Sequence, residues 1–134
     1  MNIFLDTNVL LSAFYSHGVC GDLYDHCLAY HTLFTSHYVL EEFRDKAENK
    51  LKFAPERIQS AIRHIKRYSI IVEETPLPKS ICKDTDDDHI IAAAIAAKAA
   101  CIITGDKGFL AIKKVFDIPI VSPSEFWKFA GTSR

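Results

Sequence analysis

Four carboxylates occur where a predicted strand gives way to a helix or loop, or in the first turns of a helix: Asp6, Glu42, Asp88 and Asp106. Each follows or opens a hydrophobic run, so all four could project from one edge of a sheet. Carboxylate oxygens grouped in this way are suited to holding a hard divalent cation over a phosphodiester. The cation would also relieve the repulsion that raises the pKa of neighbouring carboxylates. These residues therefore predict a metal-dependent site that cleaves phosphodiesters.

Short apolar runs and the helical patterns between them would position these acids. Strands are predicted at 2–5, 32–35, 70–72, 101–103 and 118–121. Helices are predicted to begin after Asp6, near 19, at Ser36, at Pro55, at the end of the acidic stretch 84–88, and at Ser122 or Ser124. Strands that alternate with helices predict a parallel five-stranded sheet covered on both faces. Ligands of such sheets bind beyond the carboxyl ends of the strands, where Asp6 and Asp106 would lie.

Composition excludes several other classes of protein. A chain of 134 residues suits one domain, 1–134, and 49% hydrophobic with 25% charged residues is typical of a globular protein. The net charge of −1 argues against a uniformly basic nucleic-acid binder, so a nucleic-acid surface would be a local patch. No apolar stretch approaches the ~20 residues of a membrane span, and the N-terminus has no signal-like core. We therefore expect a cytoplasmic protein without a membrane partner.

Each acid also has a purely structural interpretation. Asp6 and Asp106 could serve only as helix N-caps, and Glu42 could be a solvated helix residue. The acids between 84 and 88 would interact favourably with a helix dipole. Capping needs only one of those acids, however, and independent capping does not explain acids at four equivalent places. The joint pattern therefore favours the metal site.

Four sequence motifs resemble those of PIN domains. They are Ile3-Phe4-Leu5-Asp6-Thr7-Asn8-Val9-Leu10, Val39-Leu40-Glu41-Glu42-Phe43, Asp87-Asp88-His89-Ile90-Ile91-Ala92-Ala93-Ala94, and Ile103-Thr104-Gly105-Asp106. They follow one another in the family's order, with family-like spacing, over nearly the whole chain. The resemblance implies a three-layer α/β/α sandwich and a Mg²⁺- or Mn²⁺-dependent ribonuclease. It also implies a homodimer and the role of toxin in a toxin–antitoxin pair, with an antitoxin protein as partner.

The resemblance assigns roles to individual residues. Asp6, Asp88 and Asp106 would hold one or two ions, and Glu42 would hold a second ion or orient the attacking water. Asp87 is an alternative to Asp88, which we prefer because the apolar residues after it have the usual offset. Asn8 and Thr104 could donate hydrogen bonds to these acids or simply cap turns. Gly108 stands where many family members carry a further acid.

Substrate RNA would need cations near the acids. Segment 44–67 has eight basic and three acidic residues, a net +5, and the candidate contacts are Lys46, Lys50, Arg63 and Arg67. A solvated helical face is the more common explanation for any one of these residues. Alternatives to a toxin are a stand-alone RNA-processing nuclease and a catalytically silent domain that binds RNA or a partner. A phosphoryl-transfer domain with Asp6 as nucleophile is disfavoured, because Asn8 occupies the place of its usual second Asp.

Overall fold

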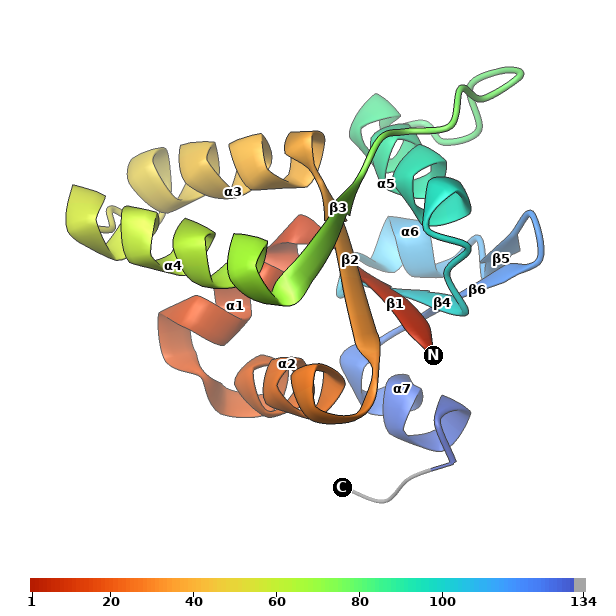
Figure 1. The fold of residues 1–134 in the computed structure, drawn as a ribbon. Helices are drawn as coiled ribbons and strands as arrows, with labels where there is room; N and C mark the ends of the chain where they lie inside the picture. Colours follow the sequence, from red (N-terminus) through yellow and green to blue (C-terminus); the bar gives the residue numbers. More distant parts are fainter. Residues whose placement is uncertain (132–134) are drawn as a thin grey trace.

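The structure is a computed structural model that describes residues 1–131, so the last three residues of the predicted domain lie outside the described part. Along the chain the elements are β1 (Asn2–Leu5), α1 (Thr7–Ser16), α2 (Gly18–Tyr30), β2 (Thr32–Ser36), α3 (His37–Asn49), α4 (Pro55–Tyr68), β3 (Ser69–Val72), α5 (Thr85–Ala96), β4 (Cys101–Ile103), α6 (Lys107–Leu110), β5 (Lys114–Val115), β6 (Ile118–Val121) and α7 (Pro123–Phe129). The predicted alternation of strands and helices is confirmed (Figure 1).

The strands form one sheet in the order β3-β2-β1-β4-β6-β5. The first five of these strands are parallel, as predicted, and β1 lies between β2 and β4. The prediction of five strands was wrong by one, because the short β5 pairs antiparallel with β6. Phe116 and Asp117 join these two strands with φ of 48° and 64°. A two-residue hairpin turn of this kind usually contains Asn or Gly, and this sequence has neither at positions 116 and 117.

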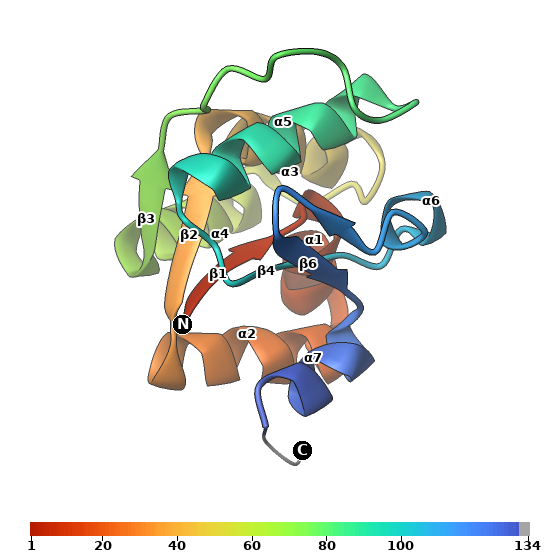
Figure 2. The same cartoon turned by 90° about the vertical axis from the view of Figure 1, so that its right-hand side faces the viewer.

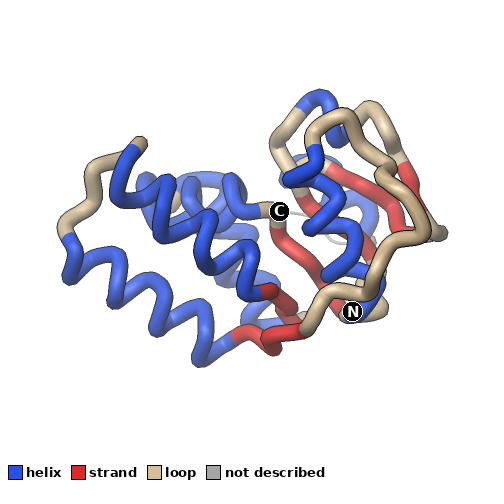
Figure 3. The backbone as a smooth tube through the Cα atoms, turned by 90° about the horizontal axis from the view of Figure 1, so that it is seen from above, coloured by secondary structure: helices blue, strands red, loops and turns tan. Residues whose placement is uncertain are grey.

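Helices cover both faces of the sheet. Figures 1 and 2 show α5 on one side and α2 with α7 on the other, which is the predicted α/β/α arrangement. Helices α3 and α4 lie side by side as an antiparallel pair that extends past the sheet (Figure 3). The loop 73–84, which joins β3 to α5, runs back along α5, where Thr75 N donates to Ala92 O at 3.0 Å.

Side-chain oxygens begin several of the helices that carry the acids. The N-caps whose side chains accept a backbone N–H are Asp6 of α1, Ser36 of α3, Asp84 of α5, Asp106 of α6 and Ser122 of α7. Such a cap satisfies a backbone donor that the helix itself leaves unpaired and contributes about 1 kcal/mol. Asp6 and Asp106 therefore do serve as helix N-caps, as their structural interpretation predicted. Their other contacts decide whether they can also bind a ligand.

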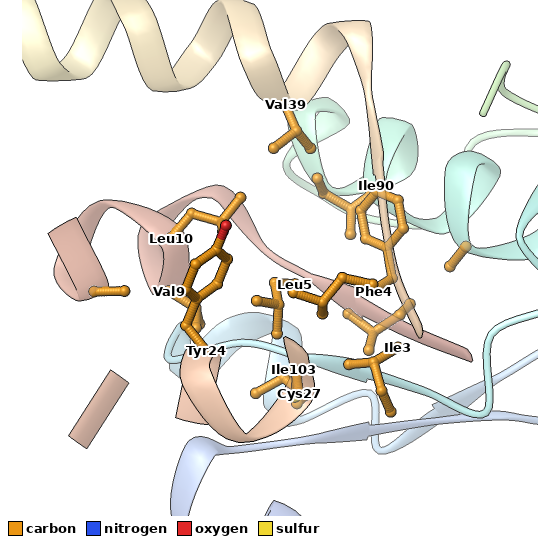
Figure 4. Packing of buried hydrophobic residues seen from close by; sticks show 14 of the residues in the cluster. Ile3, Phe4, Leu5, Val9, Leu10, Tyr24, Cys27, Val39, Ile90 and Ile103 are labelled. Atoms are coloured by element: carbon orange, nitrogen blue, oxygen red, sulfur yellow. The ribbon is translucent and has the colours of Figure 1, made fainter. Parts of the chain in front are cut away.

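The core fixes where α3 and α5 begin. Ile3, Phe4 and Leu5 of β1 are at most 2% exposed, as expected of the central strand of a sheet covered on both faces. Val39 of α3 and Ile90 of α5 point into the same part of the core above β1 (Figure 4). The first turns of α3 and α5 are thereby held near the end of β1. No helix within residues 1–131 is long and apolar enough to cross a membrane.

Candidate active site

Asp6 lies at the carboxyl end of β1 and is only 6% exposed. Its Oδ1 accepts a hydrogen bond from Thr7 N at 2.8 Å, and its Oδ2 accepts one from Thr104 Oγ1 at 2.7 Å. Burial raises the pKa of Asp6, and the charge of Glu42 adds to this effect, while the two hydrogen bonds and Lys46 oppose it. The carboxylate is therefore held in one orientation at a place where its negative charge is unfavourable.

Thr104 connects the ends of two neighbouring strands. Leu5 of β1 is in register with Ile103 of β4, so the residues after them, Asp6 and Thr104, lie side by side. The buried Thr104 hydroxyl donates to Asp6 and accepts a hydrogen bond from Asp106 N at 3.1 Å. Asp106 in turn caps α6 through Phe109 N, at 2.8 Å from Oδ2. One hydroxyl thus fixes both Asp6 and the backbone of Asp106.

Glu42 approaches the same place from α3. Its side chain is 15% exposed, and Lys46, one helical turn later, lies 3.8 Å from Glu42 Oε2. The Lys46 ammonium also donates to Asn8 Oδ1 at 3.3 Å. The Asn8 side chain is therefore hydrogen-bonded to a lysine, whereas we expected Asn8 to contact an acid. Lys46 joins the second turn of α3 to the first turn of α1.

The acidic start of α5 supplies three further carboxylates: Asp84, Asp86 and Asp87. Asp84 caps the helix by accepting from Asp86 N at 2.9 Å. Burial raises the pKa of Asp87 to about 7, and the charges of Asp6, Asp84, Asp106 and Asp86 contribute to the shift. The electrostatic influence of both Asp6 and Asp106 shows that Asp87 lies among acids from β1 and β4.

Asp88, which we preferred as the third acid, does not line the pocket. Its carboxylate accepts hydrogen bonds from Ser80 Oγ at 2.8 Å, Ile81 N at 3.1 Å and Cys82 N at 2.8 Å. Burial would raise the pKa of Asp88, but these hydrogen bonds outweigh it and lower the pKa. The helix turns by about 100° from residue 87 to residue 88, which directs the Asp88 carboxylate toward the loop 73–84 and away from the pocket that the other acids line. Asp87, which we held as the substitute, is the one that faces it.

The six carboxylates line one pocket together with three other side chains. The lining residues are Asp6, Glu42, Asp84, Asp86, Asp87, Asp106, Asn8, Lys46 and Ile90. Of the residues singled out from sequence, Asp6, Glu42, Asp106 and the substitute Asp87 are brought together here. Sequence reasoning did not place Asp84 and Asp86 at the pocket, although the density of acids between 84 and 88 was a usable signal.

The four candidate RNA contacts lie in different places. Lys46 lines the pocket, whereas Lys50 caps the far end of α3, about 12 Å further along the helix axis than Glu42. Arg63 and Arg67 are exposed on α4, and the Arg67 guanidinium lies 5.6 Å from the centre of the Tyr68 ring. Of these four residues, Lys46 alone lines the acidic pocket.

Comparison with known proteins places the chain in a family. The sequence model of the PIN domain matches residues 2–108. No curated protein matches the sequence significantly. Among solved structures, VapBC2 from Rickettsia felis, bound to a DNA fragment from their promoter, contains a chain that aligns with a TM-score of 0.67 at 20% identity, covering 91% of this chain and 98% of that one.

Two further structures share the fold at similar coverage. VapBC-1 from nontypeable Haemophilus influenzae aligns with a TM-score of 0.63 at 17% identity, over 92% of this chain and 99% of that one. FitAcB from Neisseria gonorrhoeae aligns with a TM-score of 0.55 at 16% identity, over 91% of this chain and 98% of that one. At these identities the likeness establishes the fold, and the family follows from the sequence match over most of the chain. The chain belongs to the PIN domain family.

Proposed function

We propose that the chain is a Mg²⁺- or Mn²⁺-dependent endoribonuclease that hydrolyses RNA phosphodiester bonds. The observation that supports this most directly is the convergence of Asp6, Glu42, Asp87 and Asp106 from four separate elements on one pocket. Capping accounts for Asp6 and Asp106 singly, but it gives no reason for six acids to share one lining. Membership of the PIN domain family adds support, since the resemblance implies this chemistry.

The donor set suits a hard, hydrated divalent cation. All the acids offer oxygen, and Mg²⁺ is usually held through one or two carboxylates while it keeps several waters. Within residues 1–131 no group of three or more His, Cys, Asp and Glu side chains is arranged to hold a metal, so one or two of the acids would bind the cation directly and the others through its waters. The pKa of Asp87 is raised first by burial and then by the charges of Asp6, Asp84, Asp106 and Asp86, and a bound cation would favour the ionised carboxylate.

Asp6, Asp87 and Asp106 would hold the cation, and Glu42 would hold a second cation or orient the attacking water. The bound metal would supply Lewis-acid polarisation of the phosphate and a more acidic water. Thr104 keeps Asp6 fixed through its hydroxyl, so this ligand needs no reorganisation on binding. Lys46 sits where it could contact a phosphate oxygen while staying near Glu42.

We further propose that the chain forms a homodimer and serves as the toxin of a toxin–antitoxin pair, with a single nuclease domain over 1–134. The VapBC and FitAcB structures that share its fold support this role, and the antitoxin partner with it. A neighbouring small gene for a DNA-binding protein would support the toxin role, whereas its absence would favour a stand-alone RNA-processing nuclease. Sedimentation of the purified chain, alone and with that protein, would test both assemblies.

The test of the enzyme is cleavage of a single-stranded RNA by the purified chain. We expect cleavage with Mg²⁺ or Mn²⁺, none with EDTA, and none by Asp6→Asn under either condition. Asp45→Asn, whose side chain contacts Asn49 on the exposed side of α3, is the matched control and should cleave like the wild type. Cleavage that survives both EDTA and Asp6→Asn would refute the metal mechanism, and RNA binding without cleavage would favour the silent domain.

A further inference from the structure

Two aromatic rings stack at the rim of the acidic pocket. Tyr38 lies in the first turn of α3, one turn before Glu42, and His89 lies on α5, two residues after Asp87. Their ring centres are 4.1 Å apart and the ring planes differ by 10°, which is a face-to-face stack. The pair therefore joins the two helices that bring acids to the pocket, and the capping and metal chemistry described above uses neither ring.

Both rings are held by carboxylates. The Tyr38 hydroxyl donates to the carboxylate of Asp86, which itself lines the acidic pocket. The Nδ1 of His89 lies 2.9 Å from both carboxylate oxygens of Glu74, at the start of the loop 73–84. Since these contacts come from three different segments, the stack has one defined orientation relative to the pocket. An aromatic surface fixed in advance loses little freedom when a flat ligand stacks on it.

Tyr38 also lines a groove that shares no lining residue with the acidic pocket. It has a volume of about 380 Å³, within the roughly 300–1,000 Å³ of small-molecule sites. Its lining residues are Ser36, His37, Tyr38, Val72, Glu73 and Glu74. Tyr38 lines the groove, and Asp86, which accepts its hydrogen bond, lines the pocket, so this hydrogen bond links the two sites. Tyr38 and Glu42 are about 6 Å apart along α3, close to the reach of one extended nucleotide.

We propose that the Tyr38–His89 stack and its groove bind an unpaired nucleobase of the substrate next to the scissile phosphate; this inference rests on the proposed ribonuclease function. Single-stranded RNA is commonly recognised by stacking of splayed bases on Tyr or His rings. The groove itself is acidic, which disfavours a phosphate there but not an uncharged base.

The same acids indicate which bases fit. Carboxylates of Glu73 and Glu74 accept hydrogen bonds, so they suit bases that present amino groups: adenine, cytosine and guanine. Uracil offers a single N–H between two carbonyl oxygens, and those oxygens would face the carboxylates. The groove therefore prefers an amino-bearing base to uracil at the position beside the cut.

The experiment compares single-stranded RNAs that differ at one nucleotide. After the cut site is mapped, the flanking nucleotides are replaced one at a time by an abasic residue, and kcat/KM is measured for wild type, Tyr38→Leu and Tyr38→Phe. At one flanking position we expect the abasic change to lower wild-type kcat/KM roughly 10-fold. Tyr38→Leu should lose this dependence, and Tyr38→Phe, which keeps the ring but not the contact with Asp86, should retain it.

Binding provides a readout that does not require cleavage. Fluorescence anisotropy with Asp6→Asn and with Asp6→Asn/Tyr38→Leu measures a short single-stranded RNA, both intact and with each nucleotide in turn replaced by an abasic residue. A loss of discrimination on removing Tyr38 supports the base site even if the chain cleaves no RNA, in which case only the proposed function fails. A merely structural stack predicts that Tyr38→Leu weakens intact and abasic RNAs by the same factor, and that result would overturn the inference.

A separate binding experiment tests the base preference. A uridine at the identified position should bind several-fold more weakly than the amino-bearing bases, and Glu73→Gln should remove most of that difference because an amide both donates and accepts. Equal binding of all four bases by the wild type would overturn the assignment of the groove acids. The melting temperature of each variant confirms that the compared proteins are folded.

Discussion

Asp87 and Asp88 are adjacent in the sequence, yet their carboxylates belong to different parts of the molecule. Asp87 lines the acidic pocket, where burial, together with the surrounding negative charges, raises its pKa to about 7. Asp88 faces the loop 73–84 and accepts hydrogen bonds from Ser80, Ile81 and Cys82. One acid thus provides charge to the pocket, and the other ties the loop before α5 to the start of that helix.

Asp88→Asn should loosen the loop. The amide side chain retains one acceptor oxygen but loses the charge that strengthens its hydrogen bonds, so hydrogen exchange at Ile81 and Cys82 should speed up on the order of 10-fold. Exchange in β1 should stay unchanged. Asp45→Asn is the control, because it alters an exposed acid on α3 far from this loop. Unaltered exchange at 81 and 82 would show that Asp88 has no such role.

Thr104→Val should destabilise the protein. The substitution removes the hydroxyl that donates to buried Asp6 and accepts from Asp106 N, which should lower the free energy of unfolding by about 1–3 kcal/mol at neutral pH. Thr35→Val is the matched control, since the buried Thr35 hydroxyl has no hydrogen-bond partner among the described residues, and its loss should be close to neutral. Urea unfolding measures both. Equal effects would contradict the role of Thr104.

The metal-free protein should lose stability as the pH rises from about 4 to 7. Over this range Asp87, with its pKa raised from 3.8 to about 7, holds a proton in the folded state that it loses in the unfolded state. Asp6 acts in the same direction. Asp87→Asn should flatten this slope and raise stability above pH 7 by on the order of 1 kcal/mol, or about 4 °C in Tm, after allowance for solvent screening. Thermal melts in EDTA across this range test the prediction, which an unchanged slope would contradict.

Lys46→Met should destabilise the metal-free protein by up to about 1 kcal/mol, because Lys46 is the cation beside Glu42 and Asp6. Added Mg²⁺ should reduce the deficit, since it supplies positive charge to the same acids. Lys50→Met on the same helix, outside the pocket lining, is the control. The melting temperatures of both variants are measured with EDTA and with Mg²⁺. Equal losses of stability in Lys46→Met and Lys50→Met under both conditions would contradict this role of Lys46.

Much of the fold could be predicted because caps and apolar runs mark it locally. Asp6, Ser36 and Ser122 begin helices as expected, and the run Cys101–Ile103 is the predicted strand. The strand β5 could not be predicted, because two residues give no periodicity and its turn lacks Asn or Gly. Local patterns thus specify elements better than they specify the short pairings at the sheet's edge.

The site was predictable to the level of elements but not of every side chain. Asp6 and Asp106 follow strands whose carboxyl ends must meet at one edge, so their meeting follows from topology. The choice between Asp87 and Asp88 depends on the rotational position of α5, which Ser80 and the loop amides help to fix, and no local pattern encodes that contact. The stack of Tyr38 on His89 likewise joins residues far apart in sequence.

We propose that the acids that follow β1 and β4 and those on α3 and α5 form one cation-binding pocket. Calorimetric titration of Mn²⁺ into wild type, Asp87→Asn and Asp88→Asn tests it directly, with folding verified for each. We predict that Asp88→Asn binds Mn²⁺ with close to wild-type affinity and that Asp87→Asn binds at least 10-fold more weakly, as expected when a charged ligand is lost. Wild-type affinity in Asp87→Asn, or no Mn²⁺ binding by the wild type, would contradict the claim.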